Sequence, residues 1–158
     1  MSVDERVDFS AGLAVLVVDD SPEDAEVVRR YLRQAARVGH GVRAAAGAAA
    51  GAAAGAAVGV GVAARRGPYV VHQVSTAAEA LAALRAPNQR PDVLLLDYGL
   101  PDMTGVELLD AMAALGDGTP GGLPVPAVML TGTHVQVDVA VAALQRGALD
   151  YLAKDQLS

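Results

Sequence analysis

The sequence predicts an α/β fold in which a parallel sheet carries helices on its faces. Short apolar runs of strand length alternate with segments of helical periodicity along the chain. This alternation is typical of units in which a helix connects two parallel strands. The run Val93–Leu96 has no polar residue, as expected of a strand that is buried on both faces. The predicted strands lie at about 13–18, 69–74, 93–97, 126–131 and 149–153.

Capping residues mark the starts of the predicted helices. Ser21 precedes Pro22, and proline suits the first position of a helix. Thr76 and Thr104 each stand three residues before a glutamate, which is the pattern of a capping box. Gly147 is suited to end the last helix. The predicted helices lie at about 22–37, 77–85, 105–115 and 135–146.

Composition limits the classes of function. The chain has 158 residues, enough for one domain with a sizeable core. Its formal net charge is -6, from 18 acidic and 12 basic residues, so we expect no direct binding to nucleic acid. It has no cysteine, which excludes disulfides and thiolate metal sites. The first ten residues lack the basic start of a secretory signal, and we expect a cytoplasmic location without membrane partners.

Residues 44–64 form a low-complexity tract of Ala, Gly and Val alone. These 21 uncharged residues reach the length of a membrane span. However, Ala and Gly supply little apolar area, and the tract joins two elements that must return to the same sheet. We therefore interpret about 43–67 as a low-complexity insert between the first helix and the second strand.

Chemically active side chains follow four of the five predicted strands. Asp19 and Asp20 follow the first strand, Asp97 ends the third, and Thr131 ends the fourth. Lys154, the only lysine of the chain, follows the fifth. In open parallel sheets, ligands bind outside the carboxyl ends of the strands. We therefore expect these side chains to converge on one crevice.

Such a set of side chains suits phosphoryl transfer to a carboxylate. Clustered carboxylates form a hard oxygen site of the kind that Mg²⁺ prefers. Without a cation, two carboxylates about 5 Å apart repel each other by roughly 3 kcal/mol. One carboxylate can act as the nucleophile, while a metal, an ammonium and a hydroxyl stabilise the charge on the phosphoryl oxygens.

Each feature also has a simpler explanation when it is taken alone. Asp19 and Asp20 could form a turn before a helix, although Ser21 already supplies the cap. A threonine at a strand end is common, a lysine is usually a solvated surface charge, and Tyr151 could be a core aromatic. The functional interpretation depends on their occurring together and in order.

Taken together, these motifs resemble the receiver domain of bacterial two-component response regulators. The resemblance covers residues 13–158 apart from the Ala/Gly tract, and residues 1–12 are an N-terminal tail. It implies a three-layer, flavodoxin-like (chemotaxis-Y-like), doubly wound fold with strand order 2-1-3-4-5. The matching motifs are VVDDSP at 17–22, LLDYGLPDMTG at 95–105, MLTG at 129–132 and GALDYLAKD at 147–155.

The resemblance also implies a role for each site residue. Asp97 is the phosphoacceptor, and Asp20, Asp97 and the main-chain oxygen of Gly99 bind Mg²⁺. Asp19 contributes to the metal site nearby or through water.

The remaining matches imply a switch and its partners. Thr131 hydrogen-bonds the phosphoryl group, Lys154 pairs with it, and Tyr151 is the aromatic residue whose rotation couples phosphorylation to the signalling face. The donor is a phosphohistidine on a histidine kinase or a phosphotransfer protein. A second copy of the chain or a downstream output domain is a further expected partner. The protein is then a self-phosphorylating and dephosphorylating switch and not a turnover enzyme.

The sequence departs from the family pattern in two places. Asp20 and Asp97 are 77 positions apart, which is longer than usual, and the Ala/Gly insert accounts for the excess. A longer loop costs little, since doubling its length adds only about 0.6 kcal/mol of closure free energy. The family's fifth helix would begin near Ser158, and without it we expect part of the sheet to lack cover.

Two alternatives to a phosphorylated receiver stay open at this point. A pseudo-receiver would serve as a protein-interaction module without phosphorylation. An aspartate-nucleophile phosphatase also uses Asp, Thr and Lys at strand ends. That class has its nucleophile on the first strand with a second Asp two residues later, whereas this chain has Asp19, Asp20 and Ser21. The pattern therefore disfavours the phosphatase.

Overall fold

The computed structural model describes residues 13–37, 69–86, 90–116, 122–132 and 137–157. Within them, five parallel strands form one sheet in the order β2-β1-β3-β4-β5, which confirms the predicted fold class and strand order. The strands are β1 (Leu13–Val18), β2 (Tyr69–Val74), β3 (Val93–Asp97), β4 (Ala127–Thr131) and β5 (Asp150–Ala153).

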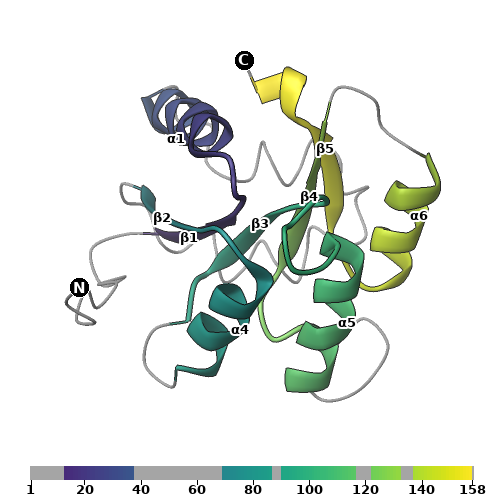
Figure 1. The fold of residues 1–158 in the computed structure, drawn as a ribbon. Coiled ribbons are helices and arrows are strands. Elements are labelled where there is room, and N and C mark those ends of the chain that lie inside the picture. The colour runs from purple at the N-terminus through teal and green to yellow at the C-terminus, as the bar shows by residue number, and fades with distance from the viewer. Residues whose placement is uncertain (1–12, 38–68, 87–89, 117–121, 133–136, 158) are drawn as a thin grey trace.

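Four α-helices and one 3₁₀ turn accompany the sheet in the described part of the chain. Figure 1 shows α4, α5 and α6 on one face of the sheet, and α1 and the C-terminal turn η1 on the other. Three of the predicted helices have the predicted bounds, and η1 was not predicted. α6 ends one residue before its predicted end, and residues 135–136 of its predicted start lie outside the described residues. The elements are α1 (Pro22–Arg37), α4 (Ala77–Arg85), α5 (Gly105–Leu115), α6 (Val137–Gln145) and η1 (Lys154–Leu157).

Alternating side chains along the strands divide the core into two clusters. In β1, Leu16 and Val18 pack toward α4, α5 and α6, while Val15 and Val17 pack toward α1. This is the period-two alternation of a strand that is buried on both faces. Helix residues complete the core on each face. On the face of α4, α5 and α6 they include Leu108, Leu109 and Met112. On the face of α1 they are Ala25, Val28 and Leu32.

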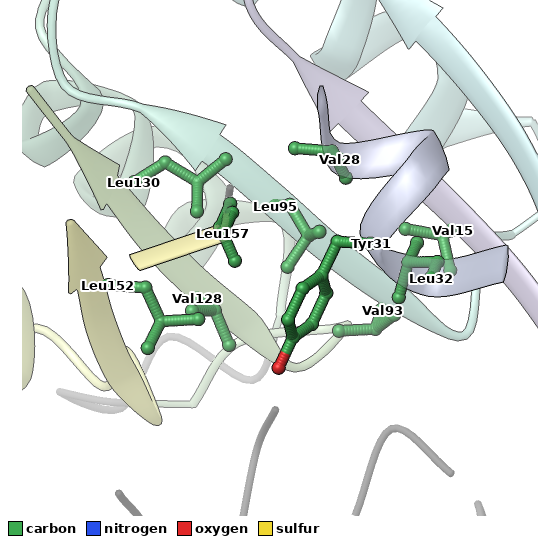
Figure 2. Close-up of a pocket in the computed structure, with 10 residues that line it drawn as sticks. All are labelled: Val15, Val28, Tyr31, Leu32, Val93, Leu95, Val128, Leu130, Leu152 and Leu157. Atoms are coloured by element: carbon green, nitrogen blue, oxygen red, sulfur yellow. The ribbon is translucent and has the colours of Figure 1, made fainter. Parts of the chain in front are cut away.

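An apolar hollow lies between α1 and the sheet (Figure 2). Tyr31 and Leu32 of α1 line one side, and Leu152 of β5 lines the other. Leu157 of η1 is buried beside Leu152 and covers part of this face. The incomplete cover that the sequence predicted thus takes the form of this hollow, and η1 reduces it. In the described residues no α-helix follows β5.

Two predicted segments lie outside the described residues. They are the N-terminal tail 1–12 and the Ala/Gly insert at about 43–67. Among the helices that the structure does describe, none has the length and apolar character needed to cross a membrane.

The register of the sheet determines where the functional side chains meet. Val18 pairs with Leu96, so Asp19 and Asp97 follow at the same level. Asp97 pairs in turn with Leu130, next to Thr131. All strands are parallel, and their carboxyl ends therefore form one edge of the sheet.

Candidate functional site

Asp19 is fixed in place by hydrogen bonds on both its main chain and its side chain. Its N–H donates to the carbonyl of Val74 at 3.0 Å, which extends the pairing of β1 with β2. Its carbonyl accepts a hydrogen bond from Gln73 Nε2 at 2.9 Å, and its Oδ1 accepts one from the N–H of Ser21 at 2.9 Å. The Asp19 side chain is buried, whereas the neighbouring Asp20 is exposed.

Asp97 is positioned by the turn that leads from β3 into α5. The N–H of Tyr98 donates to the carbonyl of Leu130 at 3.1 Å, and the N–H of Gly105 donates to the carbonyl of Tyr98 at 2.7 Å. A Cβ at Gly105 would lie 2.7 Å from the main-chain oxygen of Asp97 and 2.8 Å from Met129 Sδ. Only glycine at this position therefore allows α5 to start so close to the end of β3.

Three carboxylates meet at this edge of the sheet. Asp19, Asp20 and Asp97 each offer an oxygen, and these oxygens lie within 4.8 Å of one another. At that separation two carboxylates repel each other by roughly 3 kcal/mol at an effective dielectric constant near 20. Oδ2 of Asp19 is buried, and Nζ of Lys154 lies 2.8 Å from it. An all-oxygen set of three carboxylates fits a hard divalent cation.

The pKa of Asp97 lies above its ordinary value. Burial is the largest cause, because it disfavours the charged carboxylate. Lys154 acts in the opposite direction, while the negative charges of Asp19 and Asp20 raise the pKa further.

Lys154 is the only lysine of the chain and contacts three carboxylates at once. Its Nζ lies 2.6 Å from Asp24 Oδ2, 2.8 Å from Asp19 Oδ2 and 3.2 Å from Asp97 Oδ1. Burial alone would lower the pKa of the ammonium, but Asp19, Asp24 and Asp97 together raise it above its ordinary value. Lys154 is therefore a permanent positive charge at neutral pH, shared among these acids.

Thr131 and Tyr151 lie on neighbouring strands beside this cluster. Thr131 is buried at the end of β4, and its Oγ1 is 3.5 Å from the carbonyl oxygen of Leu152, which is a long hydrogen bond. Tyr151 is half-buried on the face of the sheet that packs against α4, α5 and α6. It pairs with Met129 across the two strands.

The model of the response regulator receiver domain matches residues 59–157, which is more than half of the 158 residues. The chain belongs to the response regulator receiver domain family. The family predicted from the four strand-end motifs is thus confirmed, and with it a place in two-component signalling.

Individual relatives of this receiver domain are longer proteins. The two-component response regulator ORR2 of Oryza sativa subspecies indica is 37% identical over 145 residues, or 89% of this chain and 54% of the relative. The transcriptional regulatory protein KdpE of Mycobacterium tuberculosis is 40% identical over 84 residues, or 52% of this chain and 34% of the relative. This chain therefore spans about half the length of these relatives, or less.

A solved structure supports the fold of the receiver domain. The phosphorylated cyanobacterial phytochrome response regulator RcpA superposes with a TM-score of 0.60. The superposition covers 93% of this chain and 86% of that structure, at 23% sequence identity.

The structure brings most of the predicted site residues of the receiver domain together. Asp19, Asp20, Asp97 and Lys154 form one cluster, and Thr131 lies on the adjacent strand end. Gly99 is exposed in the turn after Asp97, where an added Cβ would stand 4.0 Å from Asp97 Oδ2.

Sequence reasoning missed two acidic residues of the receiver domain. Asp24 pairs with Lys154, and its place in the first turn of α1, four residues after Asp20, was the only signal available. Asp102 accepts hydrogen bonds from the N–H groups of Ala77 and Ala78 at 2.9 and 3.0 Å and so caps α4. These bonds lower the pKa of Asp102. No local pattern reveals a cap whose partners lie 24 and 25 residues away.

Proposed function

We propose that this receiver domain accepts a phosphoryl group on Asp97 and uses it as a signalling switch. One observation carries the proposal: the partly accessible carboxylate of Asp97 lies 3.2 Å from the Lys154 ammonium, within a cluster of three carboxylates. A nucleophile, a cation and an oxygen-rich metal site are the groups that transfer of a phosphoryl group to an acid requires. The donor would be a phosphohistidine of a histidine kinase or a phosphotransfer protein.

Mg²⁺ is the cofactor that this donor set fits. Asp20, Asp97 and the main-chain oxygen of Gly99 would hold the ion, with Asp19 beside it or bound through water. When bound, the ion would supply positive charge that offsets the repulsion of the carboxylates and of the incoming phosphoryl oxygens.

The transfer itself requires only the nucleophile and groups that stabilise negative charge. An oxygen of Asp97 attacks phosphorus, and an O–P bond forms as the N–P bond of the phosphohistidine breaks. The imidazole nitrogen keeps the electron pair and takes a proton from solvent. Lys154 stays on the side of Asp97 Oδ1, where its charge stabilises the phosphoryl oxygens.

Thr131 and Tyr151 would convert the modification into a change of surface. Among the described residues, the hydroxyl of Thr131 makes one long hydrogen bond, to the carbonyl of Leu152, and it can exchange that bond for a shorter one to a phosphoryl oxygen. Such a movement of Thr131 would leave space for the half-buried ring of Tyr151 on the neighbouring strand. A downstream output domain or a second copy of the chain would respond to this surface, and a cytoplasmic location remains a prediction.

Treatment with acetyl phosphate and Mg²⁺ tests the proposed function. We expect up to one phosphoryl group per chain, measured by intact-protein mass spectrometry, and its loss in hydroxylamine, which cleaves acyl phosphates. The same incubation with EDTA should give no modification, because the carboxylates would then repel the donor. A chain that stays unmodified in Mg²⁺ would instead support a pseudo-receiver, and continuous release of phosphate from a generic ester would support the phosphatase.

Millimolar Mg²⁺ is expected to raise the melting temperature of the unmodified chain. A cation that binds only the folded state stabilises it by RT ln(1 + [L]/Kd), or about 2.7 kcal/mol at one hundred times Kd. Differential scanning calorimetry with and without Mg²⁺ measures the shift, and Na⁺ at matched ionic strength is the control. An equal melting temperature in the two salts would contradict a preformed cation site at Asp19, Asp20 and Asp97.

A further inference from the structure

Three carboxylates share the Lys154 ammonium in the unmodified protein. An ammonium has three N–H donors. Three carboxylates, those of Asp24, Asp19 and Asp97, surround it at 2.6, 2.8 and 3.2 Å. A phosphoryl group on Asp97 adds negatively charged oxygens beside this ammonium, so it competes for Lys154 with the carboxylates that are already there.

The three partners of Lys154 differ in how easily they can be released. The side-chain exposure is 0% for Asp19 and 13% for Asp97. Asp97 is also the residue that carries the modification. Asp24 has an exposure of 38% and lies in the first turn of α1. Releasing a buried carboxylate from its cation is expensive, whereas an exposed carboxylate is rehydrated by water. Asp24 is consequently the partner that is released at the lowest cost.

We propose that Asp24 is the exchangeable partner of Lys154, which it holds in the unmodified receiver and releases to the phosphoryl group when Asp97 is modified. Asp24 is thus a positioning residue that acts through Lys154, and it competes with the phosphoryl group for the same ammonium. This inference rests on the proposed function of Asp97.

The exchange would also change a contact between distant parts of the chain. Asp24 belongs to α1, and Lys154 is the first residue of η1, 130 positions later. Their bond links these two elements, which lie on the same face of the sheet (Figure 1). Its loss would loosen η1 from the start of α1, on the face that carries the apolar hollow.

Affinity for a phosphoryl mimic tests the competition. The variant Asp24→Asn removes the competing charge but keeps the main-chain N–H that donates to Ser21 Oγ at 3.2 Å, so the cap of α1 is retained. The matched control is Glu23→Gln, which removes one charge from the same turn at an exposed position outside the three partners of Lys154. We expect Asp24→Asn to bind beryllofluoride in saturating Mg²⁺ about fivefold more tightly than wild type, the factor that corresponds to an ion pair at the upper end of the exposed range. Glu23→Gln should stay within about twofold of wild type.

Because the chain has a single lysine, NMR can follow the beryllofluoride titration at Lys154 without overlap from other lysines. Protein labelled with ¹⁵N-lysine contains one ammonium, so NMR follows Lys154 alone. Before the mimic is added, Asp24→Asn should move the Lys154 signal and Glu23→Gln should not. Equal affinities of Asp24→Asn and Glu23→Gln, or weaker binding by Asp24→Asn, would overturn the exchange while leaving the function of Asp97 intact. Absence of binding in every variant, wild type included, would overturn the proposed function and the exchange together.

Discussion

The variant Asp97→Asn is expected to take up no phosphoryl group and, without Mg²⁺, to be more stable than wild type. The amide is not a nucleophile toward phosphorus, so the covalent step is lost entirely. The gain in stability follows from the carboxylate cluster, because the substitution removes one of three negative charges that lie within 4.8 Å of one another. Asp19 and Asp24 still pair with Lys154 in the variant.

Mass spectrometry after acetyl phosphate treatment measures the first effect, and urea unfolding monitored by circular dichroism measures the second. The matched control is Asp138→Asn, which makes the same chemical change at an exposed position in the first turn of α6. It should be phosphorylated as wild type is. Equal phosphorylation of Asp97→Asn and wild type would assign the acceptor to another residue.

The pH dependence of this stability difference has a definite sign. Burial raises the pKa of Asp97 in the folded protein above the unfolded value, so the folded state holds the proton more tightly. The protonated Asp97 therefore contributes favourably to the stability of the fold. This contribution is complete below the unfolded pKa of 3.8 and is lost as pH rises through the higher folded value. The stability advantage of Asp97→Asn over wild type should therefore grow from acidic to neutral pH in metal-free buffer.

Much of the fold could be predicted because its elements have strong local signals. The run Val93–Leu96 is apolar throughout and can only be a buried segment, and the capping boxes at Thr76 and Thr104 are formed as predicted. The convergence of Asp19 and Asp97 followed from the general geometry of parallel sheets. These signals depend only on a few neighbouring residues or on a rule that holds for the whole fold class.

Features that depend on tertiary packing could not be predicted. The pairing of Lys154 with Asp24 joins residues 130 positions apart, and it depends on how the first turn of α1 is rotated toward β5. The 3₁₀ turn η1 forms where Leu157 finds an apolar surface beside Leu152, which no local pattern of residues 154–157 indicates. In both cases the partner surface exists only once the sheet has assembled.

The variant Lys154→Met is expected to be the most destabilising single change at the site. It removes the cation from between Asp19, Asp24 and Asp97 while leaving Asp19 fully buried. Removal of one member of a buried ion pair leaves an uncompensated charge, and we expect a loss of about 3 kcal/mol in the free energy of unfolding in metal-free buffer. Urea unfolding at neutral pH measures it. The control Arg146→Met breaks the exposed ion pair with Asp110 and should cost no more than about 1 kcal/mol.

A double-mutant cycle shows whether the loss in Lys154→Met comes from the carboxylates. If Lys154 stabilises the fold by offsetting their repulsion, Asp97→Asn should be more favourable in the Lys154→Met background than in wild type. Residues in direct contact commonly show coupling of about 0.5–3 kcal/mol, and the 3.2 Å contact places this pair in that class. Mg²⁺ should also restore part of the stability of Lys154→Met, because a bound cation supplies the charge that the ammonium no longer provides. Additive effects of the two substitutions, together with no response to Mg²⁺, would mean that Lys154 stabilises the fold by packing its stem and not by its charge.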